Sequence, residues 1–403
     1  MLGAKMMRPD VALVSPYPPP GSTHAGRSGV ASYASNLARS LAREGAAVTV
    51  IAAAENGREA LSIDGPVRVE RRFRRGPGAV PAATGAAAAT GAPVVHLQHE
   101  LFLYGGADSV PGLAAALGAL RARRPRTVVT MHQVVDPRSV DSAFTRLHRV
   151  PVPAWIARAG LAGVQRTIRR LADRVVVHEA PFARLVPGAA VVPHGIETAP
   201  APARDESRDR LGLDDRFTAL CFGFVAPYKG IERALEAAAL LDGSAQLVVA
   251  GAEHPRLAAG APYAGELRRR FGATARFTGR VEDADVSRWF AAADVALFLY
   301  PRPFASSGAL ALALAHGTPP LLSPQLGSLL GAPPALTAPL EPRALAGRLA
   351  DLAAHPDRLE SVRAGSRELR AGRSWRSVAR RHLALYEEVI GADGASRRSL
   401  RST

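Results

Sequence analysis

The stretch LCFGFVAPYKGIERALEAAALL, residues 220–241, has the pattern of a strand, a loop and a helix in immediate succession. Leu220 to Phe224 is a short apolar run of the kind that forms buried parallel strands. From Ile231 onward, apolar residues recur at helical spacing, after a loop that contains proline and glycine. This order predicts an α/β domain built on a parallel sheet.

One cation, Lys229, lies in that loop just before the helix. Free backbone N–H groups and the helix dipole converge at a helix N-terminus, so a cation there can help to hold a phosphate. Of the 51 Lys and Arg residues, only Lys5 and Lys229 are lysines. A compact ammonium suits a phosphate oxygen in a tight loop better than a guanidinium fork does. We therefore interpret Lys229 as a phosphate ligand, and the alternative is an exposed lysine without a role.

The N-terminal part of the chain repeats this order. Val11 to Ser15 reads as a strand, Val30 to Glu44 as a helix and Val48 to Ala54 as the next strand, which predicts a right-handed crossover unit. The loop segment Gly21 to Ser28, GSTHAGRS, resembles a phosphate-binding P-loop except that Arg27 stands in the lysine position. We instead predict a glycine-opened helix start that lets a substrate approach the backbone, with a plain turn as the alternative.

Several predicted strands end in polar side chains. The strand Val94 to Leu97 runs into Gln98, His99 and Glu100, and other strands end at His132, at His178 and just before His194. In open α/β sheets, ligands bind beyond the carboxyl ends of the strands. We therefore expect His99, Glu100, His132 and His194 to border one cleft, although each alone is also compatible with a structural histidine or carboxylate.

In the second half, Ser306, Ser307 and Gly308 fall at a predicted helix N-terminus, where hydroxyls and free N–H groups cap the helix or bind an anion. Asp283-Ala284-Asp285 resembles a metal-binding acidic pair, but it lies at a polar helix start. We interpret this triplet as a helix cap and expect no metal site.

A chain of 403 residues predicts about two domains. Residues 199–209, APAPARDESRD, have the composition of a linker. We expect an N-terminal Rossmann-like domain over 1–197, a C-terminal one over 198–374, a helix over 375–392 and a disordered basic tail over 393–403. Residues 79–92 are rich in Ala and Gly and predict a poorly specified helix or loop.

The composition, with 47% hydrophobic and 21% charged residues, is that of a soluble globular protein. The net charge of +16 favours an anionic partner: nucleic acid, an anionic membrane or a phosphorylated substrate. Aromatic residues make up only 5%, which leaves few platforms on which bases could stack, so we expect no nucleic acid. The amphipathic helix predicted over Trp155 to Arg174 carries arginines that could touch an anionic membrane, or it packs on the sheet with a solvated basic side.

A single cysteine, Cys221, excludes a disulfide framework and fits a reducing cytoplasm. No apolar run approaches the roughly 18 residues that a membrane span requires. The sequence therefore predicts a cytoplasmic protein, with peripheral contact at the inner face of the membrane as an option.

Taken together, these segments resemble the GT-B glycosyltransferases, in particular glycosyltransferase family 4, the group 1 retaining enzymes. The matching pieces, in chain order, are VASYASNLARSLAREGAAVTVIA (30–52), VVHLQHE (94–100), TVVTMH (127–132), ADRVVVH (172–178), VVPHGIE (191–197), FGFVAPYKGIERAL (222–235), ARFTGRV (275–281), RWFAAADVALFLY (288–300) and SSGALALALAHGTP (306–319). The resemblance implies two Rossmann-like doubly wound domains facing an interdomain cleft, with the last helix crossing back to the first domain. It also implies a nucleotide-activated sugar on the C-terminal domain and the acceptor on the N-terminal one.

By the same resemblance, Lys229 corresponds to the lysine on the donor phosphates and His132 to the histidine that faces the donor sugar. Gly29 falls in the loop near the phosphates, and Ser307-Gly308 opens the helix beside them. This implies a metal-independent, retaining transfer from a nucleoside-diphosphate sugar to an unidentified acceptor (glycan, lipid or metabolite), without a cofactor. A cation and a helix N-terminus would stabilise the charge on the leaving diphosphate.

The sequence departs from the family pattern at three positions. Phe304 and Leu312 stand where the family often has two glutamates, and Phe224 replaces an arginine five residues before Lys229. The identity of the sugar and of the nucleotide therefore stays open. The alternatives to a transferase are a non-catalytic GT-B-like scaffold or partner subunit, or a basic protein that binds nucleic acid or a membrane surface.

Overall fold

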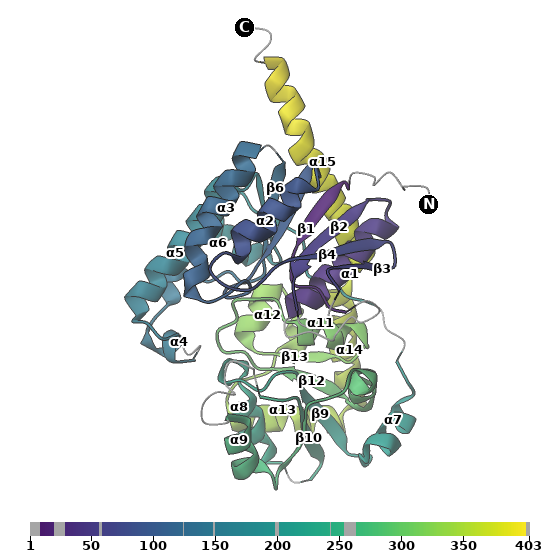
Figure 1. The fold of residues 1–403 in the computed structure, drawn as a ribbon. Helices are drawn as coiled ribbons and strands as arrows, with labels where there is room; N and C mark the ends of the chain where they lie inside the picture. Colours follow the sequence, from purple (N-terminus) through teal and green to yellow (C-terminus); the bar gives the residue numbers. More distant parts are fainter. Residues whose placement is uncertain are drawn as a thin grey trace. The chain divides into compact units, whose positions relative to one another are not determined.

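The computed structural model describes residues 9–19, 29–55, 59–123, 125–147, 150–197, 201–241, 243–253 and 263–399. The chain divides into two compact units: unit 1 comprises Met1–Gly195 and Trp375–Thr403, and unit 2 comprises Ile196–Ser374. The first unit thus ends two residues before the predicted boundary at 197. Each unit has helices packed around a sheet (Figure 1).

Unit 1 contains, in its described part, an eight-stranded sheet in the order β3-β4-β2-β1-β5-β6-β7-β8. All neighbouring strands are parallel except β3 and β4. The sequence did not predict β3, a four-residue edge strand with two exposed side chains and no long apolar run. The strands are β1 (Val11–Val14), β2 (Val48–Ala53), β3 (Leu61–Asp64), β4 (Val67–Phe73), β5 (Val94–His99), β6 (Arg126–Met131), β7 (Arg174–Val177) and β8 (Ala190–Val191).

The helices of unit 1 cover both faces of this sheet. The β1–α1–β2 crossover moves toward one edge and β4–α2–β5 toward the other, so right-handed crossovers place α1 and α2 on opposite faces. Helix α15, from the end of the chain, contacts α1 and β6. The helices are α1 (Gly29–Arg43), α2 (Ala79–Ala89), α3 (Val110–Arg123), α4 (Ser142–Leu147), α5 (Ala154–Leu171), α6 (Ala180–Leu185) and α15 (Trp375–Ser399).

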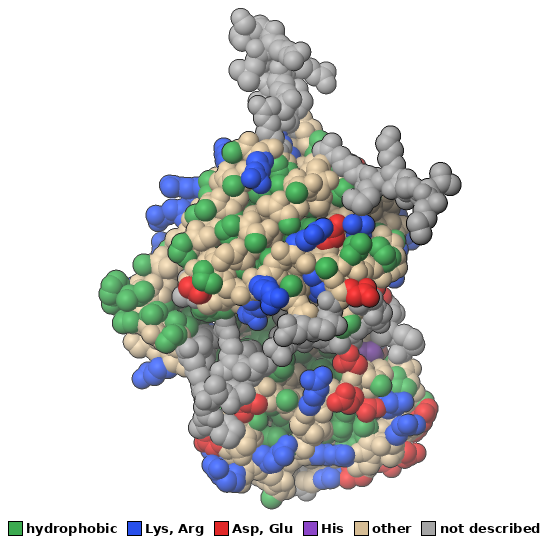
Figure 2. Space-filling model, in the orientation of Figure 1, with side chains coloured by type: hydrophobic (Ala, Val, Ile, Leu, Met, Phe, Trp, Pro, Cys, Tyr) green, Lys and Arg blue, Asp and Glu red, His purple; other side chains and the backbone are tan. Residues whose placement is uncertain are grey.

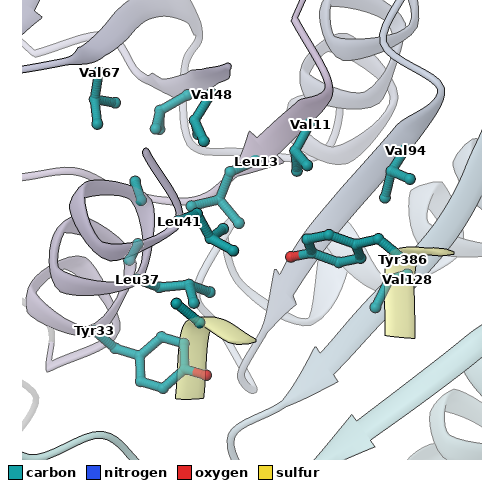
Figure 3. Close-up of a cluster of buried hydrophobic side chains, with 14 of the residues drawn as sticks. Val11, Leu13, Tyr33, Leu37, Leu41, Val48, Val67, Val94, Val128 and Tyr386 are labelled. Atoms are coloured by element: carbon teal, nitrogen blue, oxygen red, sulfur yellow. The ribbon is translucent and has the colours of Figure 1, made fainter. Parts of the chain in front are cut away.

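The core of unit 1 joins the start and the end of the chain. Alternate strand residues such as Leu13 and Val50 pack with Tyr33 and Leu37 of α1 and with Tyr386 of α15 (Figure 3). A structure in which the last helix completes the first domain is what the family resemblance implied. The sequence placed the end of this helix at residue 392, whereas α15 continues to Ser399.

The alanine-rich region 79–92, predicted as poorly specified, contains the regular helix α2. Alanine has the highest helix propensity, and Ala83 and Ala87 are fully buried between the sheet and α3. The small side chains allow α2 to pack closely against its neighbours. The sequence did not reveal this packing, because the region has few large apolar residues.

The described residues of unit 2 form a five-stranded, all-parallel sheet in the order β11-β10-β9-β12-β13. The strands are β9 (Phe217–Phe222), β10 (Ala245–Ala250), β11 (Ala275–Gly279), β12 (Val295–Phe298) and β13 (Pro320–Leu322). The helices are α7 (Arg204–Leu211), α8 (Ile231–Ala238), α9 (Tyr263–Phe271), α10 (Val286–Ala292), α11 (Gly308–Ala315), α12 (Pro324–Leu330), α13 (Pro342–Ala354) and α14 (Pro356–Arg370).

The predicted fold class, two Rossmann-like α/β domains, is confirmed. Across the described residues, no helix has both the length and the apolar character needed to cross a bilayer.

Candidate functional site

The stretch that opened the sequence analysis forms a tight arrangement around Lys229 in unit 2. Strand β9 ends at Phe222, and Gly223 follows with a φ of +91°. A β-carbon on Gly223 would lie 3.1 Å from Nζ of Lys229 and 3.5 Å from Cβ of Ala309 in the first turn of α11. The ammonium and the N-terminus of α11 therefore meet beside the glycine that ends β9.

The backbone on either side of Lys229 is fixed by glycine. Gly230 has a φ of +68°, and a β-carbon there would come within 2.2 Å of the carbonyl oxygen of Leu299. No other residue fits this position without moving the loop. The short 3₁₀ turn Pro227–Lys229 is thereby held against the end of β12.

Lys229 is a half-buried ammonium, and none of the described carboxylates forms an ion pair with it. Burial lowers its pKa to about 8. Desolvating a cation without an internal counter-ion is costly, and the cost is recovered when an anion binds. Within the described residues, this ammonium is thus arranged for an external anion.

The N-terminus of α11 adds hydrogen-bond donors. Ser307 caps the helix: its Oγ accepts from the backbone N of Leu310 at 3.3 Å and lies 2.9 Å from Oη of Tyr300. The backbone N–H groups of Gly308 and Ala309 have no acceptor among the described residues. Ser306 immediately precedes the cap. Together with Lys229, these two N–H groups can bind the oxygens of a phosphate group.

Apolar side chains flank Lys229. Phe224 is 37% exposed, and the rings of Tyr228 and Phe304 meet edge to face with centroids 6.4 Å apart. Leu312, on α11, is half-buried. The positions at which the resemblance leads one to expect charged groups thus present hydrophobic surface.

In unit 1, His132 directly follows β6 and is 8% exposed. Both of its ring nitrogens have internal partners: Nε2 lies 2.8 Å from Oε1 of Gln98, and Nδ1 lies 3.1 Å from Nε2 of His178. The ring of Tyr33 meets it edge-on at 4.6 Å between centroids. Burial, and then the neighbouring His178, hold the pKa of His132 well below its usual range, so the ring is neutral at pH 7.

The other predicted residues of unit 1 lie at the same carboxyl edge of the sheet. His99 is buried, its Nδ1 has no partner among the described residues, and burial lowers its pKa to about 4. Glu100 accepts a hydrogen bond from Nε2 of Gln133 at 2.5 Å. His194 has Nδ1 2.8 Å from the carbonyl oxygen of Gly195, and its ring packs on Tyr33.

Gly29 is the first residue of α1, and a β-carbon there would contact nothing in the described structure. The glycine-containing segment Gly21 to Ser28 lies outside the described residues. The start of the β1–α1 loop is held by Arg71, a buried side chain that donates to the carbonyl oxygens of Tyr17, Pro18 and Ala53.

Sequence reasoning missed several residues around His132, among them Gln98, Tyr33 and Trp375. Gln98 was noted only as part of a polar strand end, although the alternation of His96 and Gln98 in VVHLQHE places both on one face of β5. Trp375 packs on Gly195, where a β-carbon would come within 2.3 Å of the indole ring. No signal in the sequence links these two residues, which lie far apart along the chain.

The acidic triplet Asp283–Asp285 forms a 3₁₀ turn ahead of α10. Asp285 occupies the N-cap position but makes no side-chain cap hydrogen bond, and it pairs with Arg288 at 2.5 Å instead. Asp285 therefore stands at the predicted N-cap position, but its side chain pairs with Arg288 and does not cap the helix. No group of three or more His, Cys, Asp or Glu in the described part of the chain is arranged to hold a metal ion.

Comparison with known proteins supports this picture of the fold. Residues 27–200 match the model of Glycosyltransferase Family 4. Sucrose-phosphate synthase from Thermosynechococcus elongatus superimposes with a TM-score of 0.74 and 22% identity, over 96% of this chain and 100% of that one. Alr3699/HepE from Anabaena, in complex with UDP, gives a TM-score of 0.67 and 14% identity, over 94% and 100%.

The catalytic domain of starch synthase IV from Arabidopsis thaliana, bound to ADP and acarbose, gives a TM-score of 0.64 and 13% identity, over 96% and 100% of the two chains. No curated protein sequence matches the chain. The fold is that of the GT-B glycosyltransferases. The resemblance to family 4 that the sequence predicted is confirmed, with the family match confined to the part of the chain before Lys229.

Proposed function

We propose that this protein is a glycosyltransferase that moves a sugar from a nucleoside-diphosphate sugar to an acceptor, with retention of configuration and without a metal ion. The observation that carries the proposal is the ammonium of Lys229, which pairs with no described carboxylate and lies beside the N-terminus of α11. HepE, which has the same fold, has been crystallised with UDP and with UDP-glucose. Retention is supported by the resemblance to family 4.

The chemistry follows from the charge that develops. Cleavage of the bond between the anomeric carbon and the diphosphate oxygen leaves positive charge on the sugar and negative charge on the diphosphate. Lys229 and the N–H groups of Gly308 and Ala309 stabilise that negative charge, as preorganised donors in a partly desolvated loop. The ammonium supplies the positive charge for which other phosphate sites use a metal ion.

Unit 1 supplies the residues for the sugar and the acceptor. His132, which by resemblance corresponds to the histidine that faces the donor sugar, lies with His99, Glu100 and His194 at the same edge of the sheet. The acceptor is a glycan, a lipid or a metabolite.

We also propose contact with an anionic membrane surface, at the cytoplasmic face. In α5 only Val164 and Ile168 are buried, while Trp155 is 69% exposed and Ile156 39% exposed. Hydrophobic side chains gather over the end of unit 1 formed by α4 and the start of α5 (Figure 2). Exposed arginines on the same helix are complementary to acidic lipid headgroups.

Release of nucleoside diphosphate from a panel of nucleotide-sugars tests the proposed activity. Lys229→Ala is expected to lower kcat by about 100-fold or more, in line with the loss of one preorganised donor to a developing anion. Arg280→Met, which removes an exposed cation from the same unit, is the matched control and should retain full activity. Nucleotide-sugar binding without release by the wild type would instead identify a non-catalytic GT-B protein.

A further inference from the structure

A continuous hydrogen-bond chain runs through the buried core of unit 1, from α15 to the end of β7. We call it the buried chain; it comprises Tyr386, His96, Gln98, His132, His178 and the carbonyl of Val192. Its contacts are Tyr386 Oη to His96 Nδ1 (2.7 Å), His96 Nε2 to Gln98 Nε2 (3.1 Å), Gln98 Oε1 to His132 Nε2 (2.8 Å), His132 Nδ1 to His178 Nε2 (3.1 Å) and His178 Nδ1 to the carbonyl oxygen of Val192 (3.0 Å).

The donors and acceptors in this chain are not independent. A neutral imidazole has one N–H and one lone pair, and a carbonyl oxygen only accepts. The carbonyl of Val192 therefore requires the proton of His178 to be on Nδ1, which leaves Nε2 of His178 as an acceptor. His132 must then donate from Nδ1, and its own Nε2 can only accept.

The neutral chain thus needs a donor from Gln98 toward His132. With the NH₂ group on that side, the oxygen of Gln98 lies toward His96, whose Nε2 must carry a proton. His96 Nε2 can also donate to Oγ1 of Thr130 at 2.7 Å, and its Nδ1 then accepts from the hydroxyl of Tyr386. Every contact along the chain is satisfied, and no group is charged.

In the opposite orientation of the Gln98 amide, the buried chain needs one more proton to satisfy all of its contacts. If the oxygen is toward His132, Nε2 of His132 must donate and Nδ1 must accept from His178. His178 then needs protons on both nitrogens to satisfy Val192 as well. In the structure, Oε1 and Nε2 of Gln98 stand in this second arrangement, and a half-turn of the amide about its terminal bond gives the first.

We propose that Gln98 is a positioning residue for His132: its NH₂ group donates to Nε2 of His132 and so supports the proton on Nδ1 that the carbonyl of Val192 requires through His178. In the neutral chain, Gln98 holds Nδ1 protonated and Nε2 as the acceptor. Burial favours the neutral chain, since it lowers the pKa values of both His96 and His132. The link to catalysis rests on the proposed function, while the proton arrangement itself does not.

Among the described residues, no carboxylate interacts with the ring of His132 and opposes this arrangement. The titratable groups that interact with its ring are His96 and His99 on β5, His178 and His194 after β7 and β8, and Tyr33 on α1. All except Tyr33 would repel a proton on His132 if they were themselves charged. The carbonyl of Val192 therefore sets the proton position through His178, and Gln98 supplies the donor that Nε2 of His132 then needs.

Gln98→Glu tests the proposal, because a carboxylate accepts from both histidines and cannot donate. Long-range ¹H–¹⁵N spectra of histidine-labelled protein, with His132 assigned through a His132→Gln variant, report the tautomer. We expect the proton of His132 on Nδ1 in the wild type and on Nε2 in Gln98→Glu. The added charge should also raise the pKa of the His132–His178 pair by about 1–3 pH units.

Gln98→Leu, of similar size and apolar, keeps the test decisive if the glutamate variant does not fold; it should keep the proton on Nδ1, because the carbonyl of Val192 still requires it through His178. Thr127→Val is the matched control, because the buried hydroxyl of Thr127 has no partner among the described residues. It should leave the tautomer unchanged. A proton on Nε2 of His132 in the wild type or in Gln98→Leu, or an unchanged tautomer in Gln98→Glu, overturns the proposal.

The pH dependence of kcat separates this proposal from the proposed function. If nucleotide-sugar turnover occurs, its acid limb should move upward by about 1 pH unit or more in Gln98→Glu. An unchanged acid limb would exclude Gln98 as a positioning residue for the reaction. If no variant shows turnover but the tautomer switches as expected, the proton arrangement stands and the transferase assignment fails.

Discussion

Lys229 is a charged residue that its surroundings do not favour. Its ammonium is half-buried beside Gly223 and Ala309, and burial lowers its pKa to about 8 from an ordinary value of 10.5. In the unfolded chain the same group keeps its ordinary pKa. The folded protein therefore binds this proton less tightly than the unfolded chain does. At neutral pH, the charged ammonium thus lowers the free energy of unfolding.

Replacing Lys229 by Met, which keeps the apolar stem, is expected to stabilise the protein in the absence of ligand. The pKa difference corresponds to roughly 3 kcal/mol at pH 7. Because the folded pKa is depressed, the penalty is complete below about pH 8 and disappears as the pH rises toward 10.5. Urea unfolding of wild type and Lys229→Met at pH 7 and pH 10 measures both effects, and a variant less stable than the wild type at pH 7 would contradict the account.

Single residues also show what the sequence revealed about the site. The strand–loop–helix pattern around Lys229 placed the ammonium correctly before α8. The approach of Lys229 to the first turn of α11 depends on Gly223, and the sequence shows the glycine but not which atoms lie against it. Gln98 was overlooked because a polar residue at a strand end reads as a surface residue, whereas its partners His96 and His132 bury it completely.

Among the elements, α15 packs on α1 although the two are separated by most of the chain. Trp375, at its first turn, is 6% exposed and packs directly on Gly195 at the end of the first stretch of unit 1. This contact explains why a glycine stands after His194, which the sequence alone did not.

Gly195→Ala is expected to destabilise unit 1 by about 1–3 kcal/mol, because the new methyl overlaps the Trp375 ring. Gly118→Ala, in α3, is the control. A β-carbon there meets nothing within 4 Å, so the same change should stabilise by about 0.5–1 kcal/mol. Denaturant unfolding measures the change in the free energy of unfolding for each variant. Equal changes would show that the contact between Gly195 and Trp375 does not limit the size of residue 195.

Helix α5 differs from an ordinary packed helix by the exposure of Trp155. Trp155→Ala is expected to lower partitioning onto anionic vesicles by about tenfold, because one large side chain no longer enters the interface. Ile390→Ala, an exposed apolar residue on α15, should have no effect. Co-sedimentation with anionic and zwitterionic vesicles measures this, and equal binding by Trp155→Ala and wild type would remove the membrane from the list of partners.

The spacing of apolar residues in the sequence predicted the longer helices and strands. The crossover unit β1–α1–β2, the strands β5 to β7 and the helices α11 and α15 lie within a few residues of their predicted positions. Helix α10 begins only at Val286, because a 3₁₀ turn takes up the predicted first turn. Short edge strands such as β3 carry too few apolar residues to be recognised.

For the whole molecule, the order of motifs predicted two α/β domains, and the GT-B fold confirms it. The return of the C-terminal helix to unit 1 came from the family resemblance and not from periodicity, since no local pattern encodes a contact over such a distance. The chemistry assigned to the molecule depends on the loop that carries Lys229, which lies outside the family match.

Calorimetric titration with UDP, GDP and ADP tests the central claim most directly, since it asks whether Lys229 binds the diphosphate. We expect the wild type and Arg280→Met to bind at least one of these nucleotides with equal affinity. Lys229→Met should bind it about 10–100-fold more weakly, the loss expected for one charge-assisted hydrogen bond. Undiminished nucleotide affinity in Lys229→Met would contradict the account.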